Sequence, residues 1–285
     1  MNSAVLKTAI AASVTMVAFA FNSLLARAAL GPELIDPASY TTVRLLAGAI
    51  VLFALVTIRP GKPETPSSGS WQSALWLFVY AVLLSFAYIT LETGVGALIL
   101  FAAVQGTMIG WGIYSGERPS LLAWIGNVAA LAGFIYLVLP GTLNAPDPFG
   151  AVLMFFSGVA WGIYSLRGRG AGDPLGTTAT NFIYSVPMTL VLSVIFFTQF
   201  DVTNNGIILA AISGGITSGM GYALWYTALK GLTATKAAII QLTAPVIAAI
   251  AGVILLSEAV TSQLVVGSIL IVGGVATAIL AKSKA

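Results

Sequence analysis

The side chains with most chemistry to offer are aromatic and polar groups that recur at helical spacing inside long apolar stretches. Between residues 149 and 167, Ser157, Trp161 and Tyr164 stand at i, i+4 and i+7, so a helix places them on nearly one face. Rings and polar groups that face an internal space suit an apolar or aromatic solute. The candidate substrate-binding residues of this type are Trp161, Tyr164, Gln105, Met108, Trp111, Tyr80, Tyr88, Tyr222 and Trp225. The alternative is that these side chains pack helix against helix or form interfacial belts.

Two amides, Asn22 and Gln241, are the deepest in their apolar stretches. Either could bind the ammonium or carboxylate group of a zwitterion, and we include both among the candidate binding residues. The alternative is a structural hydrogen bond between helices, which contributes about 0.6 kcal/mol in membrane proteins.

Arg44 is the one charge well inside a predicted span. An ionisable group at such depth is by default a candidate functional residue. Its long side chain could instead extend towards the interface, or its guanidinium could bind backbone carbonyls. Because no nearby span offers a clear carboxylate partner, the sequence favours a structural role.

The residues that most enzymes need are missing. The chain has no His and no Cys, which excludes His-based triads, His-ligated metals, disulfides and thiolate metal sites. No span carries paired carboxylates at its middle, so general acid–base catalysis and carboxylate metal sites are disfavoured. We therefore expect no enzyme, no metal and no cofactor.

The elements that position these side chains are membrane-spanning helices. Of the 285 residues, 58% are hydrophobic and only 7% are charged, and the mean hydropathy is +0.99. Apolar runs of about 20 residues are long enough to cross a bilayer, where only a helix satisfies its own backbone. The sequence predicts an all-α membrane protein with ten transmembrane helices near 6–27, 37–58, 72–91, 94–115, 120–139, 149–167, 176–198, 205–228, 235–256 and 261–281.

A weak internal repeat divides these spans into two sets of five. Ala97, Gly126 and Gly133 return 141 residues later as Ala238, Gly267 and Gly274. An odd number of crossings in each copy forces the second copy to insert upside down, as in many secondary transporters. We expect two inverted five-helix repeats, residues 1–142 and 143–285, in one membrane unit. Because the first span's pattern recurs in the sixth, we expect that span to be retained rather than cleaved as a signal.

Charge sets the expected orientation. With the N-terminus inside, ten of the twelve Lys and Arg residues fall in cytoplasmic segments, which is the bias that sets topology. Both termini are then cytoplasmic, in a bacterial-type inner membrane. No basic patch lies on a soluble surface, so the lipid bilayer is an expected partner and nucleic acid is not. The acidic residues fall at span ends or in loops, which favours transport without proton coupling.

Small residues and prolines indicate where helices approach and bend. Gly158 and Gly162 form a small-xxx-small pair that permits close helix packing or sliding. Pro245 interrupts the ninth span and frees the carbonyl of Gln241, which makes it a hinge candidate.

A family resemblance rests on residues 226–267 and on a weaker N-terminal copy, Tyr88-Ile-Thr-Leu and Ala97 through Glu117-Arg-Pro. The segments Tyr226-Thr-Ala-Leu-Lys-Gly-Leu, Gln241-Leu-Thr-Ala-Pro-Val and Leu255-Leu-Ser-Glu258 resemble the repeat motif of the drug/metabolite transporter superfamily, EamA type. The aromatic-rich spans most resemble exporters of aromatic and other amino acids of the YddG type. The resemblance implies ten helices in inverted repeats, a central cavity, and a structural role for Glu258.

Together these features predict a secondary transporter that exports aromatic and other neutral amino acids across the cytoplasmic membrane by alternating access. An exporter of another small metabolite or a lipophilic drug is the alternative. The substrate range, the direction of net flux, any coupling ion and the oligomeric state stay open.

Overall fold

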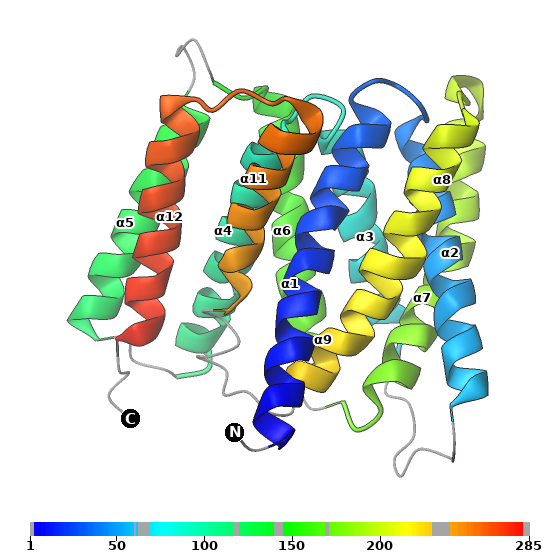
Figure 1. Cartoon of the computed structure of the whole chain (residues 1–285), viewed down its shortest axis with the longest axis horizontal. Helices are drawn as coiled ribbons and strands as arrows, with labels where there is room; N and C mark the ends of the chain where they lie inside the picture. Colours follow the sequence, from blue (N-terminus) through cyan, green and yellow to red (C-terminus); the bar gives the residue numbers. More distant parts are fainter. Residues whose placement is uncertain are drawn as a thin grey trace.

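Helices running side by side form the molecule (Figure 1). The computed structural model describes residues 3–59, 61, 69–116, 120–139, 145–168, 171–229 and 240–281. The helices of the first half are α1 (Ser3–Leu30), α2 (Pro37–Ile58), α3 (Trp71–Ala87), α4 (Thr93–Tyr114) and α5 (Leu121–Val138). Those of the second half are α6 (Pro148–Gly168), α7 (Pro174–Ile195), the 3-10 turn η1 (Phe197–Gln199), α8 (Asn204–Ile212), the π-helix η2 (Ser213–Met220), α9 (Gly221–Leu229), α11 (Thr243–Leu256) and α12 (Ser262–Leu280).

Seven helices in the described ranges are long and apolar enough to cross a membrane. They include the continuous run Asn204–Trp225, which joins α8, η2 and most of α9. Three more apolar helices are shorter, namely α3, α11 and most of α12. The predicted all-helical membrane fold is therefore confirmed. The first five residues of the predicted ninth span, 235–239, lie outside the described residues.

Two helices begin with the same local signal. Asp36-Pro37 starts α2, and the Asp36 side chain accepts a hydrogen bond from the backbone N–H of Ser39. Asp173-Pro174 starts α7, and Asp173 accepts from the backbone N–H of Gly176 at 3.1 Å. An aspartate satisfies an N–H that the helix leaves unpaired, and proline fits the first turn because its missing N–H is not needed there. These short polar caps fix where each apolar helix begins.

The closest helix pair is α5 and α12, which lie side by side at one end of the molecule (Figure 1). A Cβ added to Gly126 would lie 2.5 Å from the carbonyl oxygen of Gly274, and one added to Gly274 would lie 2.6 Å from that of Gly126. Gly133 faces Leu270 and Ile271, and Gly267 faces Leu137. As numbers rise along α5 they fall along α12, so the two helices run antiparallel. Glycine is required here because any side chain would meet backbone atoms of the partner helix.

The other helices pack in a regular scheme. α2 packs against α7, and α4 against α11. α1 contacts α9 and α11, while α6 contacts α3 and α4. The α6–α4 contact runs through the glycine pair noted in the sequence. A Cβ on Gly158 would lie 2.7 Å from that of Ala103, and one on Gly162 would lie 2.9 Å from that of Thr107.

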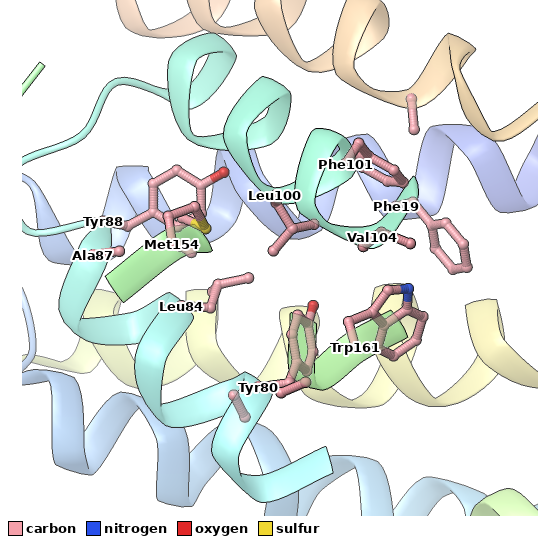
Figure 2. Packing of buried hydrophobic residues seen from close by; sticks show 14 of the residues in the cluster. Phe19, Tyr80, Leu84, Ala87, Tyr88, Leu100, Phe101, Val104, Met154 and Trp161 are labelled. Atoms are coloured by element: carbon pink, nitrogen blue, oxygen red, sulfur yellow. The ribbon is translucent and has the colours of Figure 1, made fainter. Parts of the chain in front are cut away.

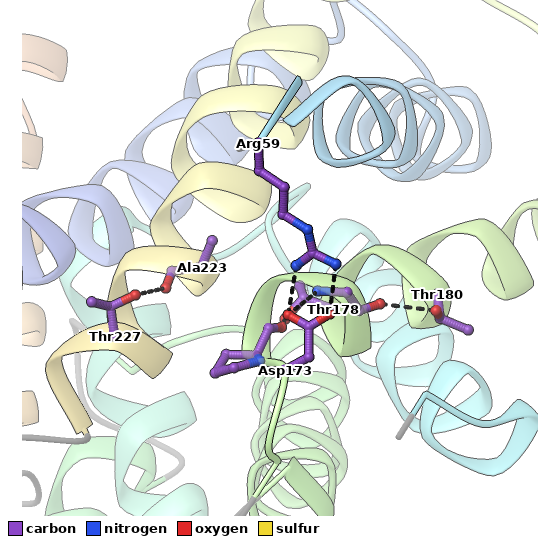
Figure 3. A network of polar contacts seen from close by, with 8 residues as sticks. Arg59, Asp173, Thr178, Thr180, Ala223 and Thr227 are labelled. Carbon is purple, nitrogen blue, oxygen red and sulfur yellow. Dashed lines mark hydrogen bonds and ion pairs between the residues drawn. The ribbon is translucent and has the colours of Figure 1, made fainter. Parts of the chain in front are cut away.

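An ion pair joins α2 to α7 at the side of the molecule where α1 begins and α12 ends (Figures 1 and 3). The Arg59 guanidinium donates two hydrogen bonds, at 2.8 and 3.0 Å, to the two carboxylate oxygens of Asp173. This fork-to-fork geometry is the strong form of such a pair. The hydrogen bond to Asp173 raises the pKa of Arg59, so the guanidinium stays charged.

At the opposite side, Glu258 joins the end of α11 to the start of α4. One of its carboxylate oxygens accepts from both the backbone N–H and the hydroxyl of Thr93, each at 2.7 Å. Glu92, the residue before α4, makes no such capping bond. Desolvation, with repulsion from Glu258, raises the pKa of Glu92. Glu258 thus caps the start of α4, which agrees with the structural role that the family resemblance implied.

α11 starts immediately after a break in the ninth span. Leu242 is a turn residue, and Pro245 occupies the first turn of α11 as a buried side chain. Proline suits that position because a first-turn N–H has no partner within the helix. A hinge at Pro245 stays a prediction.

Candidate functional site

Trp161 is the centre of an aromatic cluster built from four separate helices. Figure 2 shows Trp161 with Phe19 and Tyr80. The ring centres of Tyr222, Tyr80, Tyr164 and Phe19 lie 4.6, 4.9, 5.4 and 6.0 Å from that of Trp161. Phe19 extends the cluster to Trp225, 5.9 Å away. The rings meet at tilted or edge-on angles, which are the favoured arrangements of aromatic pairs. α1, α3, α6 and α9 therefore converge on one indole.

The cluster is closed in this conformation. The cavity bounded by Phe19, Asn22, Tyr80, Trp161 and Tyr222 measures only about 10 Å³. Such a space holds about one water molecule. The rings fill the centre themselves, so a bound amino acid would require them or their helices to move.

A hydroxyl network surrounds Asn22 next to this cluster. The side-chain oxygen of Asn22 accepts hydrogen bonds from Ser213, Thr217 and Ser218 at 3.2, 2.6 and 2.9 Å. Its amide nitrogen donates to the backbone carbonyl of Thr217 at 3.3 Å. All three hydroxyl groups come from the π-helix η2, and such π segments occur frequently at functional sites. Asn22 thus joins α1 to η2 with every polar atom in use.

Arg44 lies next to the same network and is fully buried, with 1% of its surface exposed. Its Nε donates to the hydroxyl of Ser218 at 3.2 Å, and Nη2 donates to the hydroxyl of Tyr80 at 3.0 Å. The guanidinium carbon also lies 5.2 Å from the centre of the Tyr80 ring, within cation–π range. Among the residues that the structure describes, its third nitrogen, Nη1, is buried and has no hydrogen-bond partner. The sequence favoured a structural role for Arg44. A structural role alone does not explain why Nη1 is buried without a partner.

Five predicted residues lie outside the Trp161 cluster, and the last of them, Gln105, lines a separate cavity. Trp111 is 53% exposed and contacts the ring of Tyr114 near the end of α4, so the structure does not bring it to Trp161. Met108 is partly buried against the hydrophobic core. Tyr88 is fully buried at the end of α3, beside Gly96. Gln241 is buried next to the break before α11.

Gln105 lies on a different and larger space. A cavity of about 640 Å³ is lined by α4, α5, Phe155 of α6 and Val275 of α12, and Gln105 is one of its residues. The amide nitrogen of Gln105 is buried and has no hydrogen-bond partner within the described ranges. A second, mostly apolar cavity of about 620 Å³ lies between α11 and α12. These two spaces are lined mainly by α4, α5, α11 and α12, and neither is lined by Trp161.

Sequence reasoning missed Ser213 and Thr217. Both are small hydroxyl residues four positions apart, which is a visible signal beside Ser218. Their convergence on one acceptor depends on the π-helical backbone, which an assumed α-helical period does not reveal.

Comparison with known proteins agrees with this membrane architecture. Residues 148–280 match the model of the EamA-like transporter family. Uncharacterized protein PA1977 of Pseudomonas aeruginosa is 44% identical over 270 residues, which cover 95% of this chain and 93% of that protein. An uncharacterized transporter of Archaeoglobus fulgidus is 27% identical over 94% of this chain and 96% of its own length. Uncharacterized transporter YoaV of Bacillus subtilis is 22% identical over 85% of this chain and 86% of its own length.

A solved crystal structure has the same fold. It aligns with a TM-score of 0.67 over 95% of this chain and 98% of its own, at 20% sequence identity. At that identity the likeness extends to the fold alone. The family match and the relatives that align over most of this chain are transporters by name. They identify this protein as a transporter rather than an enzyme. The chain is a multi-pass integral membrane protein that belongs to the EamA-like transporter family.

Proposed function

We propose that this transporter exports aromatic and other neutral amino acids by alternating access, with the Trp161 cluster as the centre of its binding site. The observation that carries the proposal is the convergence of Phe19, Tyr80, Trp161 and Tyr222 from α1, α3, α6 and α9. Apolar walls with a few polar groups are typical of small-molecule sites. Separation of these helices on one side would open the cluster to that side.

The helix contacts support two inverted repeats, residues 1–142 and 143–285, within ten spans. Under a twofold axis that exchanges the repeats, α5–α12, α2–α7 and α4–α11 map onto themselves. The same operation exchanges α1–α9 with α6–α3, and α1–α11 with α6–α4; all these contacts are present. At residue level, Gly126 faces Gly274 while their repeat images, Gly267 and Gly133, lie on the same interface. Such self-complementary contacts are characteristic of twofold symmetry.

Closure of the Trp161 cluster fits an occluded stage of the transport cycle. The ion pair Arg59–Asp173 joins α2 and α7 on the side of the termini, which we propose is cytoplasmic. The Glu258–Thr93 contact joins α11 and α4 on the other side. An intermediate between the inward-open and outward-open states is closed on both sides, so helix contacts on both sides fit that state.

A specific observation favours the alternative of a lipophilic compound. The 640 Å³ cavity beside α5 is large enough for a drug-sized molecule and mostly apolar. A ligand there would contact Gln105 and Asn127 rather than Trp161. The two proposals therefore predict different contact residues.

Counterflow in proteoliposomes tests the proposal. Vesicles containing purified protein and unlabelled phenylalanine should take up labelled phenylalanine transiently, and external leucine or tryptophan should compete. Spermidine and glutamate, which carry extra charge, should compete poorly. If no amino acid supports counterflow while a lipophilic cation or drug does, the alternative replaces the proposal. Protein-free vesicles control for passive leakage.

A further inference from the structure

We infer that Arg44 and Tyr80 form a carboxylate subsite at the edge of the Trp161 cluster, and that this subsite selects substrates by their carboxylate rather than by their ammonium group. The inference rests on the proposed function and specifies its substrate class. The ligands it predicts are monocarboxylates with an apolar or aromatic side chain, amino acids among them.

The first step is the uncompensated charge of Arg44. Among the described residues its hydrogen-bond partners are the neutral hydroxyls of Ser218 and Tyr80. Within the described ranges, the ion pair found is that between Arg59 and Asp173, which leaves Arg44 without a carboxylate. A buried cation is strongly unfavourable unless it is paired, and an anion that reaches Nη1 would relieve this cost.

The second step is the hydroxyl of Tyr80. Its oxygen accepts from Arg44 at 3.0 Å and from the hydroxyl of Tyr222 at 3.4 Å. Among the described residues the Tyr80 hydroxyl itself donates to no acceptor. A hydroxyl that accepts from a cation is polarised and becomes a better donor. Tyr80 also lines the small central cavity with Trp161, so its proton is available where a substrate's polar end would lie.

The third step is the lack of an anionic group that could pair with an ammonium ion. The oxygen of Asn22 already accepts three hydroxyl groups. Among the described residues the buried acidic side chain is that of Asp173. It accepts hydrogen bonds from the Arg59 guanidinium and from the backbone N–H of Gly176 at the start of α7. The groups around the Trp161 cluster therefore supply donors for a carboxylate but no anion for an amine.

The competing explanation is that Arg44 only holds α2, α3 and η2 together. A structural arginine predicts equal loss of all ligands on substitution. A carboxylate subsite instead predicts a loss that depends on whether the ligand carries a carboxylate, so ligand analogues separate the two.

The experiment measures competition against counterflow of labelled phenylalanine at pH 7.5. With wild-type protein, 3-phenylpropionate (carboxylate without amine) should compete within about threefold of phenylalanine. Phenylalaninamide (amine without carboxylate) should be weaker by about tenfold or more, the usual scale for a hydrogen bond to a charged group. Equal competition by both analogues, or better competition by the amide, overturns the carboxylate subsite while leaving amino-acid transport intact. Wild-type vesicles without any phenylalanine counterflow would instead overturn the proposed function.

Two substitutions sharpen the result. Arg44→Gln should remove the preference for carboxylates, so that phenylalanine and its amide bind with similar, weak affinity in a thermal-shift assay. Arg27→Gln is the matched control, because Arg27 binds the carbonyls of Tyr88 and Ile89 at the end of α3 rather than the Trp161 cluster. It should leave the ratio between the two ligands unchanged. A full carboxylate preference in folded Arg44→Gln protein contradicts the inference. If that variant does not fold, the wild-type competition series decides alone.

Discussion

Trp161 is the side chain on which the proposed binding site depends most directly. Four other rings approach it, and it lies within the bundle with 6% of its surface exposed. Trp111, the other tryptophan that the sequence indicated, is half exposed on α4. The pair therefore offers a direct comparison of a central and a peripheral indole in one protein.

We predict that Trp161→Ala weakens transport of aromatic substrates by about three- to tenfold, because it removes aromatic contact beyond simple area burial. Trp161→Phe should recover part of the loss, since it keeps a ring. Trp111→Ala should have the smaller effect. Concentration dependence of counterflow, at matched amounts of folded protein, is the measurement. Equal transport by wild type and Trp161→Ala would assign the indole to packing.

At this scale the sequence predicted which side chains share a face but not what covers that face. Helical spacing grouped Trp161 with Tyr164, and Tyr222 with Trp225, and these four residues do lie in one cluster. The same reasoning included Trp111. Lipid and protein interior are both apolar, so periodicity alone does not distinguish a ring that faces lipid from one that faces another helix.

Among the helices, the contact between Glu258 and the start of α4 is a cap supplied from another element. We predict that Glu258→Ala lowers thermal stability by about 0.5–2 kcal/mol, because the Thr93 N–H loses its acceptor. Glu258→Gln keeps an acceptor oxygen and should cost less. Melting of the detergent-purified protein measures both. An unchanged midpoint for Glu258→Ala would show that water or another group caps α4 equally well.

The α5–α12 interface gives a prediction with an internal control. A methyl group on Gly274 would lie 2.5 Å from the backbone nitrogen of Ala130, whereas one on the adjacent Gly273 meets nothing within 4 Å. Gly274→Ala should therefore destabilise the protein by about 1–3 kcal/mol through overpacking. Gly273→Ala should be neutral or slightly stabilising, since alanine favours helix. The yield of folded, monodisperse protein and its melting temperature report the difference, and similar behaviour of both variants would contradict the close contact.

For the whole molecule, the proposed orientation follows from the basic residues. A reporter fused after Ala285 should behave as cytoplasmic, and one inserted near Pro146, between α5 and α6, should behave as external. Alkaline phosphatase and green fluorescent protein fusions give complementary signals for the two sides. A cytoplasmic signal near Pro146 would contradict both the ten-span topology and the inverted repeats.

The charge distribution also predicts how transport is driven. The buried charged residues in the described ranges are Arg44 and Asp173, and Asp173 caps α7 at a helix end. Proton-coupled carriers usually place a titratable carboxylate or histidine within the membrane. We therefore predict movement down the solute's own gradient. Vesicles with equal phenylalanine on both sides and an imposed pH gradient should show no net accumulation; accumulation that a protonophore abolishes would contradict this prediction.

Much of the fold could be predicted because hydrophobic length and turn residues act locally. The expected span 37–58 coincides with α2, whose Asp-Pro start is visible in the sequence. The expected first span, 6–27, was shorter than α1, since apolar residues continue the helix past its predicted end to Leu30. The hydroxyl network on Asn22 and the partners of Arg44 could not be predicted. They depend on how distant helices cross, which no local pattern specifies.

The π-helix within the Asn204–Trp225 span has a mechanical consequence. A π segment winds about one extra residue into the helix, so everything downstream is displaced by about 100° in rotation and about 1.5 Å in rise from its place in an uninterrupted α-helix. If the π turn moved along the helix, α9 would rotate about its own axis and shift along it relative to α8. Nearly all backbone N–H groups would still bond to carbonyls within the same span. Tyr222 and Trp225 would turn with it, on one side of Ser213–Met220, while the residues of α8 kept their places on the other. The span could thus change its aromatic face without exposing a broken backbone to lipid.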